Sequence, residues 1–514
     1  MKFDFWNNPI LVTSMRVRYR RGGLFNITTV YLLLLVAGGA ALAYYNHVFG
    51  GPWSRNYLLA MLGLQFFGFG LIAGGATAAS LRAEVAERTL DFQRIAALSP
   101  QQILLGKLLG EPAIAYLLPV TSIPLGVYCW LLGVQGLSLL VLILLYVLLF
   151  TNTILIGSLG LLQQVERPAS KASAMTSGGS WGWGWLVLEF LLVATGQSSL
   201  ASPTSAAIVG LLTPAAALHG LFSGDPWRYA LSFYGVQIPF LLLTPVAQLA
   251  LAFLCFRLMS RRLLNPLNTS LGKPTAYLTL LAIDLLAAGV LTEPIPVGLP
   301  ILQRCVAYSL VHLTACYFLF GSVTPMRDTL LSWLWRFRGR SSRAWDLGVG
   351  DRSENGLALV TFCVIGILGL LFLVVWPAAR QEGVAAAQVD RVGIGSILLV
   401  TMLLVLSLGT LYQWFVFIAG RVGRTAFFTF VAIIVVPFHV LGSYYQNGFL
   451  LSLTPSALFG DWIIGSPSPS LLPFVIEYGL FLVLSWVSLR RRMGRARRAI
   501  DQKLEGMGVK QAPA

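Results

Sequence analysis

The chain has 514 residues, of which 56% are hydrophobic and only 11% are charged, and its formal net charge is +16. Soluble domains usually carry about 25% charged residues, so the composition excludes a soluble protein. The apolar residues form repeated blocks of about 18–25, the length of a membrane-spanning helix. The basic residues lie in short clusters between these blocks, which favours membrane topology over nucleic-acid binding. We therefore predict an all-α, multi-pass protein of the inner (plasma) membrane.

The first 23 residues are polar and basic, and the apolar blocks follow them in chain order. We predict about twelve transmembrane helices by the length criterion. They lie near residues 24–46, 57–80, 103–130, 137–162, 181–200, 230–256, 276–292, 301–322, 356–376, 393–417, 425–443 and 470–489. With both termini in the cytoplasm, nearly all of the 36 Lys and Arg residues fall on the cytoplasmic side, as the positive-inside rule requires.

The twelve predicted spans divide into two sets of six, over residues 24–262 and 263–489. NPI at 8–10 matches NPL at 265–267, and LTPAAAL at 212–218 matches LTPSALF at 453–459. Six spans return the chain to the side from which it started, so two copies would have the same orientation. We therefore predict two parallel six-helix repeats. The basic segment 490–514 follows the last span, and we expect it to contact anionic lipids of the inner leaflet.

A charged stretch, SLRAEVAERTLDFQRIAAL at 80–98, interrupts the apolar pattern after the second predicted span. Its apolar residues recur every three or four positions, which predicts a narrow amphipathic helix. Glu84 and Arg88 stand four apart, as a helical ion pair does. Ser99, Pro100 and Gln102 then form the pattern of an N-terminal capping box, so a new helix should begin there. The stretch suits either a lipid-surface anchor or, because acidic and basic residues alternate, a protein contact.

ERTLD at 87–91, LSP at 98–100 and ILLGKLL at 103–109 resemble the signature of ABC-2 type permeases, the membrane subunits of a class of ABC exporters. NPIL at 8–11, with the basic residues after it, resembles the elbow helix of that family, here residues 1–23. The resemblance implies that residues 81–98 are a coupling helix that docks into a cytoplasmic ATPase. The implied contact residues are Glu84, Glu87, Arg88, Leu90, Asp91, Phe92, Arg94, Ser99 and Pro100.

The equivalent loop of the second half, residues 323–355, matches the signature poorly. It combines arginines with tryptophans, a mixture that also describes a helix lying in the lipid headgroups. Its candidate residues for a second ATPase contact are Arg327, Asp328, Trp333 and Arg336.

Permeases of this family usually have six spans, so the resemblance implies a double-length version with both membrane halves in one chain. The chain lacks the sequence GxxxxGK[ST] of a phosphate-binding loop, so other proteins would have to hydrolyse the ATP. The resemblance thus implies two separate ABC ATPase subunits, which bind ATP and Mg²⁺, while this chain is not an enzyme and binds no cofactor. Substrate would leave the cytoplasm or the inner leaflet. The alternatives are an ion-coupled secondary transporter, with Asp284 and Glu189 in its pathway, and a noncatalytic membrane scaffold. His312 and the five cysteines are interpreted as packing residues.

Overall fold

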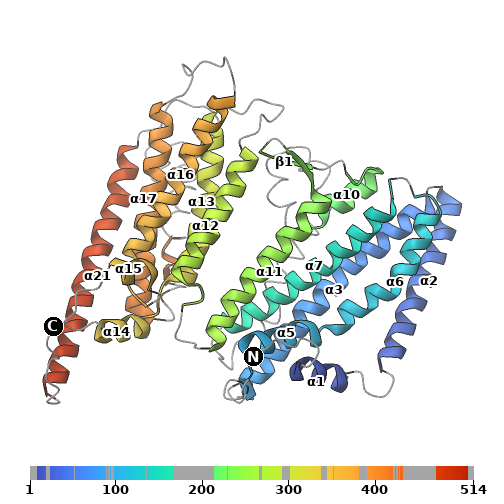
Figure 1. The fold of residues 1–514 in the computed structure, drawn as a ribbon, viewed down its shortest axis with the longest axis horizontal. Helices are drawn as coiled ribbons and strands as arrows, with labels where there is room; N and C mark the ends of the chain where they lie inside the picture. Colours follow the sequence, from blue (N-terminus) through green and yellow to red (C-terminus); the bar gives the residue numbers. More distant parts are fainter. Residues whose placement is uncertain are drawn as a thin grey trace. The chain divides into compact units, whose positions relative to one another are not determined.

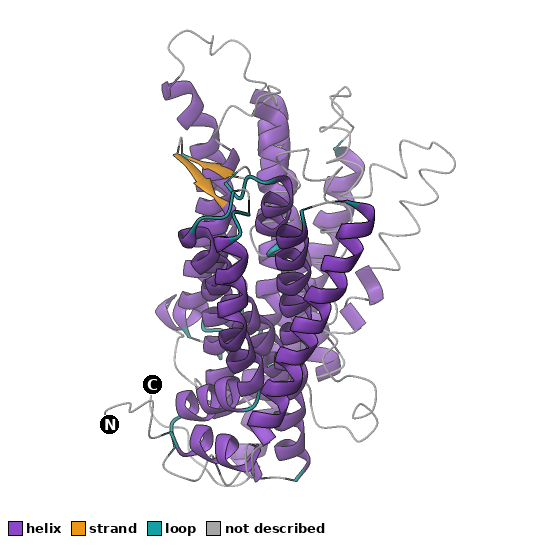
Figure 2. Cartoon of the chain, turned by 90° about the vertical axis from the view of Figure 1, so that its right-hand side faces the viewer, coloured by secondary structure: helices purple, strands orange, loops and turns teal. Residues whose placement is uncertain are grey.

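The computed structural model describes most of the chain. The described residues are 8–18, 23–50, 52–87, 89–90, 93, 98–134, 136–166, 213–227, 230–234, 236–264, 269–291, 301–336, 344–350, 352–380, 391–420, 423, 426–427, 429–431 and 471–506. They are mainly helical, as Figure 2 shows. Ten of these helices are long and apolar enough to cross a membrane. The prediction of a multi-pass helical membrane protein is therefore confirmed.

The chain divides into two compact units: Met1–Leu231 with Val236–Leu264, and Ser232–Gly235 with Asn265–Ala514. The first unit contains α1 (Pro9–Arg18), α2 (Gly23–Phe49), α3 (Trp53–Ala86), α5 (Pro100–Gly110), α6 (Ala113–Leu131), α7 (Leu139–Glu166), α10 (Ala215–Ser223) and α11 (Phe240–Leu264) (Figure 1). The second contains α12 (Lys273–Leu291), α13 (Ile301–Val323), α14 (Arg327–Arg336), α15 (Ala344–Val349), α16 (Gly356–Arg380), α17 (Arg391–Ala419) and α21 (Leu472–Gly506). Strands β1 (Ala230–Phe233) and β2 (Val236–Pro239) form a short two-stranded sheet.

The long helices of the first unit are held together by close backbone approach as well as by apolar side chains. α7 packs between α3 and α11. A Cβ atom added at Gly160 of α7 would lie 2.5 Å from the carbonyl oxygen of Gly74 in α3, so only glycine fits there. The hydroxyl of Thr77 donates to the carbonyl oxygen of Gly157 at 3.0 Å. Small residues and interhelical hydrogen bonds are what hold helices together in lipid, where apolar burial supplies little drive.

The second unit repeats the pairing of spans seen in the first. In the first unit α2 contacts α3 and α6, α3 contacts α6, and α7 contacts α3, α6 and α11. In the second unit α12 contacts α13 and α16, α13 contacts α16, and α17 contacts α13, α16 and α21. The first, second, third, fourth and sixth predicted spans are α2, α3, α6, α7 and α11 in the first unit, and α12, α13, α16, α17 and α21 in the second. The fifth predicted spans, 181–200 and 425–443, lie outside or almost wholly outside the described residues. The element order and the packing are therefore alike in the two units.

Several predicted boundaries differ from the structure. The helix of the second predicted span does not end at 80, because α3 continues to Ala86. The span expected at 103–130 is wrong in its first part, because the chain turns at Glu111 and Pro112 and the long helix is α6. Proline has no N–H and clashes with the preceding turn, so it ends α5. The span expected at 230–256 begins later, because β1 and β2 occupy residues before Phe240. The helix of the last predicted span does not end at 489, since α21 continues unbroken to Gly506.

Candidate functional site

The stretch that resembles the permease signature lies where α5 begins. Ser99 is the N-cap of α5, and its hydroxyl oxygen accepts from the backbone N–H of Gln102 at 3.3 Å. The side chain of Gln102 accepts in turn from the backbone N–H of Ser99 at 2.8 Å. Pro100 occupies the first helical position. The predicted capping box and the start of a helix after Ser99 are confirmed.

The N-terminal helix α1 packs against α5, although the two are about ninety residues apart in sequence. The side-chain amide of Asn8 donates to the carbonyl oxygen of Gln102 at 2.7 Å, and its oxygen accepts from the N–H of Ile10 at 3.1 Å. A Cβ atom added at Gly106 would lie 2.8 Å from the Cβ of Ile10. The hydroxyl of Ser14 lies 3.1 Å from the carboxylate of Glu111. The NPIL and LLGKLLG stretches therefore form one contact surface.

Lys107 of α5 forms the centre of a polar cluster, which we call the Lys107 junction (Ser80, Glu84, Gln93 and Lys107). Its side chain is fully buried, with Nζ 2.6 Å from a carboxylate oxygen of Glu84 and 3.1 Å from the hydroxyl of Ser80. Glu84 also accepts from the side-chain amide of Gln93 at 2.9 Å. A buried ammonium without an acidic partner would cost several kcal/mol. The junction therefore fixes the end of α3 and the segment after it to α5.

The sequence places Glu84 beside Arg88 on an outward face, but the structure directs it inward to Lys107. α3 runs without a break to Ala86, so Glu84 lies in the last turns of the same helix as the second span. Glu87 is exposed at the C-cap of α3, and Leu90 is buried against apolar residues of α5. Four of the expected contact residues, Arg88, Asp91, Phe92 and Arg94, lie outside the described residues.

Sequence reasoning did not identify Lys107 as a site residue. Lys107 entered only as part of the ILLGKLL stretch that resembles the permease signature. Two signals were present: a single lysine inside the apolar run LLGKLLG, and a glutamate at the end of an otherwise apolar helix. Two opposite charges that each interrupt an apolar helix commonly pair, because each alone would be costly to bury.

In the second unit, α14 occupies the place between the second and third spans. It packs against α17 and α21, where Leu330 is buried with Phe417, Leu489 and Met493, and Trp333 contacts this cluster. Two of the expected contact residues, Arg327 and Asp328, are exposed in the first turn. Arg336 ends the helix, and its side chain is outside the described part.

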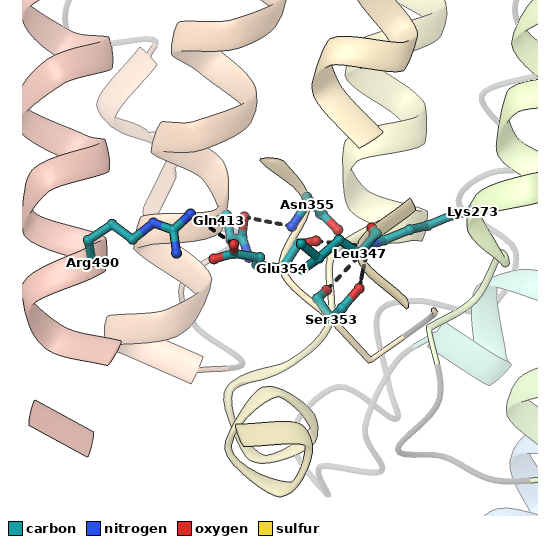
Figure 3. A network of polar contacts seen from close by, with 7 residues as sticks. All are labelled: Lys273, Leu347, Ser353, Glu354, Asn355, Gln413 and Arg490. Atoms are coloured by element: carbon teal, nitrogen blue, oxygen red, sulfur yellow. Dashed lines mark hydrogen bonds and ion pairs between the residues drawn. The ribbon is translucent and has the colours of Figure 1, made fainter. Parts of the chain in front are cut away.

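Residues 353–355, just before α16, form a second polar hub (Figure 3). The fully buried ammonium of Lys273 donates to the hydroxyl of Ser353 at 2.7 Å and to the backbone oxygens of Leu347 and Glu354, both at 2.8 Å. The carboxylate of Glu354 lies 3.0 Å from Arg490 of α21. The hub thus connects the start of the second unit to its last helix.

Asn355 completes this hub from the N-terminus of α16. Its side-chain amide donates to the hydroxyl of Thr324 at 2.8 Å, and its backbone N–H donates to the side-chain oxygen of Gln413 at 3.2 Å. Through residues 353–355 the start of α16 is therefore bonded to α12, to the end of α13, to α17 and to α21. Each unit fixes the region between its second and third spans through a fully buried lysine.

The candidate pathway residue Asp284 lies within α12, where its carboxylate is 2.8 Å from the Nδ1 atom of His312 in α13. The second candidate, Glu189, lies outside the described residues. Among the described residues, no group of His, Cys, Asp and Glu side chains is arranged to hold a metal ion. All five cysteines are buried and free, which fits their interpretation as packing residues.

The described sites therefore connect neighbouring helices through buried polar contacts and include a buried contact between Asp284 and His312. A scan of protein-family models, a search of curated proteins and a search of solved structures each found no match to this chain.

Proposed function

We propose that this chain is the membrane subunit of an ATP-driven exporter, in which separate cytoplasmic ABC ATPase subunits hydrolyse ATP. The observation that carries the proposal is the Lys107 junction. The stretches that resemble the ABC-2 permease signature and elbow helix meet in one contact region there, through α1, α5 and the end of α3. A coupling device needs such rigid attachment, because a displacement at the surface must reach the spans without being absorbed locally.

The repeated packing of the two units supports the double-length version of this proposal. Equal span pairing in α2–α11 and α12–α21 is what a duplication in parallel orientation produces. Two membrane halves in one chain would be served by two ATPase subunits, which bring ATP and Mg²⁺. Both termini, α1, α5 and α14 would then face the cytoplasm of an inner-membrane protein.

ATP-driven closure of the two ATPases would push on the segment after α3 in the first half and on α14 in the second. Gln93 and Glu84 would carry the displacement to Lys107 and hence to α5 and α1. The hub at residues 353–355 would carry it to four helices of the second half. The displaced helices of each half would move substrate out of the cytoplasm or the inner leaflet.

The first test is whether the neighbouring reading frame encodes an ABC ATPase, and the second is to co-express that ATPase with this chain and reconstitute both in lipid vesicles. The double change Glu87→Ala with Arg88→Ala should lower the stimulation of ATP hydrolysis by the membrane subunit. Glu87 is exposed, so thermal unfolding of the single variant Glu87→Ala should match that of the wild type. A separate variant, Arg327→Gln, tests the loop of the second half. Unchanged stimulation in the Glu87/Arg88 variant would remove that segment from the coupling path.

The ion-coupled carrier is the second candidate, and the buried pair of Asp284 and His312 favours it. Intramembrane ionisable residues commonly mark ion or proton pathways. The two candidates differ in their energy source: a secondary carrier moves its substrate down an ion gradient in vesicles without nucleotide, whereas an ABC exporter needs ATP and its ATPase subunits.

A further inference from the structure

One side of the apolar part of α21 faces away from the rest of the second unit. The other side is buried, and there Leu489 and Met493 pack against Leu330 of α14. The large apolar side chains that stay exposed recur every three or four positions, as residues on one face of a helix do. They are Leu472, Ile476, Leu480, Val483 and Leu484. In a helix long and apolar enough to cross a membrane, such a face borders lipid.

The lipid-facing side of α21 continues directly into arginines. Residues 472–489 cover about 27 Å at 1.5 Å per residue, close to the hydrocarbon thickness of about 30 Å. Arg491, Arg495 and Arg498 lie about two, three and four turns after Leu484, so they share its side of the helix. All three are exposed, and we call them the basic stripe.

The basic stripe has no anionic partner in the described part of the chain. The neighbouring Arg490 pairs with the carboxylate of Glu354 at 3.0 Å, but no stripe residue makes an ion pair with a described residue. Like charges three or four positions apart on a helix repel each other, so the stripe disfavours its own helix. α21 is nevertheless unbroken to Gly506. An anionic ligand on the stripe would remove this repulsion.

Headgroup phosphates are the anions that the stripe would meet where α21 leaves the hydrocarbon. Trp486 is exposed one turn before Arg490, whose guanidinium carbon lies 5.6 Å from the centroid of its ring. Exposed tryptophan beside arginine is typical of the headgroup level of a bilayer. Helical side chains tilt toward the N-terminus of their helix, which for this end of α21 is the membrane side. The arginine side chains are therefore tilted back toward the headgroups.

The sixth predicted span of the first unit, α11, has no such stripe. It ends at Leu264, and of the two arginines in its last turn Arg261 is half-buried and Arg262 is buried. α21 instead runs past α14 with its arginines exposed, as Figure 1 shows for the path of the helix. The basic stripe is therefore a feature of the second unit that crossing the membrane does not require.

We propose that the basic stripe binds the headgroup phosphates of anionic phospholipids, with Trp486 and Arg490 at its membrane edge. A guanidinium group binds phosphate through two parallel N–H bonds, and the clustered positive charge selects an anionic headgroup over a zwitterionic one. Because Glu354 holds Arg490 to the hub at residues 353–355, a lipid bound here also holds the end of α21 to that hub. The site goes beyond ATP-driven export and does not depend on an ATPase partner.

The experiment measures the binding of single phospholipids to the purified full chain in a neutral detergent by native mass spectrometry. The probes are phosphatidylglycerol, which is anionic, and phosphatidylcholine, which is zwitterionic. Each arginine beside an anionic lipid contributes about fivefold in affinity. Arg491→Gln with Arg495→Gln should therefore lower the affinity for phosphatidylglycerol at least about tenfold and change that for phosphatidylcholine less than about twofold.

The matched control is Arg492→Gln with Arg497→Gln, which removes two exposed arginines from the same stretch at other rotations of the helix. It should lower the affinity for phosphatidylglycerol less than about threefold. An equal loss in the two double variants would show only a diffuse attraction to the basic tail and would overturn the proposed site. Unchanged affinity in Arg491→Gln with Arg495→Gln would also overturn it, and would leave the stripe to a protein partner.

Thermal unfolding with and without phosphatidylglycerol gives a second readout. A ligand that binds only the folded state stabilises it, so the lipid should raise the unfolding temperature of the wild type and of the matched control. It should not raise that of Arg491→Gln with Arg495→Gln. Each variant is compared with itself, so a change in folding caused by the substitutions does not enter the comparison. Equal stabilisation of the stripe variant and the wild type would contradict the proposal.

Discussion

Replacing Lys107 by methionine should destabilise the first unit measurably, because it leaves Glu84 without its cation. Removing one partner of a buried ion pair costs about 3–5 kcal/mol. The Glu84 side chain is 21% exposed and keeps its hydrogen bond from Gln93, so some water still reaches the carboxylate. The expected loss of unfolding free energy is therefore about 2–3 kcal/mol, below that range.

A second change tests whether the cost comes from the unpaired charge. Glu84→Gln keeps the shape of the side chain and its acceptor for Gln93 while removing the charge. The double variant Lys107→Met with Glu84→Gln should regain most of the stability and lie within about 1 kcal/mol of the wild type, because neutral replacements of a buried pair are well tolerated. Glu84→Gln alone leaves the fully buried ammonium of Lys107 without an acidic partner and should cost about 3–5 kcal/mol, so the cycle should give a coupling energy of at least about 4 kcal/mol.

The assay is heat or denaturant unfolding of the purified chain in one detergent, followed by tryptophan fluorescence. The single and double variants are compared under the same conditions, so the detergent contributes equally to each. A Lys107→Met variant as stable as the wild type would refute the reasoning. So would a double variant as unstable as Lys107→Met alone, since the loss would then come from packing of the lysine stem and not from charge.

Three further changes test the contacts within each unit. Gly160→Ala should cost about 1–3 kcal/mol in thermal unfolding, because its methyl group would meet the Gly74 carbonyl, whereas Gly63→Ala, which meets nothing within 4 Å, should be neutral or slightly stabilising. Asn355→Ala should cost about 1–3 kcal/mol, since it removes a donor from a buried hydroxyl partner in the hub before α16. Ser99→Ala should cost about 1 kcal/mol by removing the cap of α5, and a cost near zero would show that the cap does not hold this corner.

Sequence periodicity predicted the long helices well, because an apolar run of span length has few other stable forms in a membrane. The capping box at Ser99 was equally readable, since it depends on residues three positions apart. Boundaries were less predictable. Apolar residues at 230–239 suit a strand or a helix, and the run through 103–130 concealed the break at Pro112.

The long-range contacts of the candidate sites could not be predicted from the sequence. Lys107 and Glu84 are 23 positions apart, and Asp284 and His312 are 28 apart in adjacent helices. Each of these residues is recognisable in the sequence because it is polar within an apolar helix. Which residue it contacts depends on the rotation of the helices about their axes. That rotation is set by packing contacts such as those of Gly160 and Gly366, which no local pattern encodes.

The central claim is that this chain receives work from separate ABC ATPase subunits. Its most direct test is affinity purification of the tagged chain from membranes in which the neighbouring ATPase is co-expressed, followed by measurement of subunit stoichiometry and ATP hydrolysis. We predict that two ATPase subunits co-purify with each chain and that the chain alone hydrolyses no ATP. Purification of the chain without any ATPase, or ATP hydrolysis by the chain alone, would contradict the account.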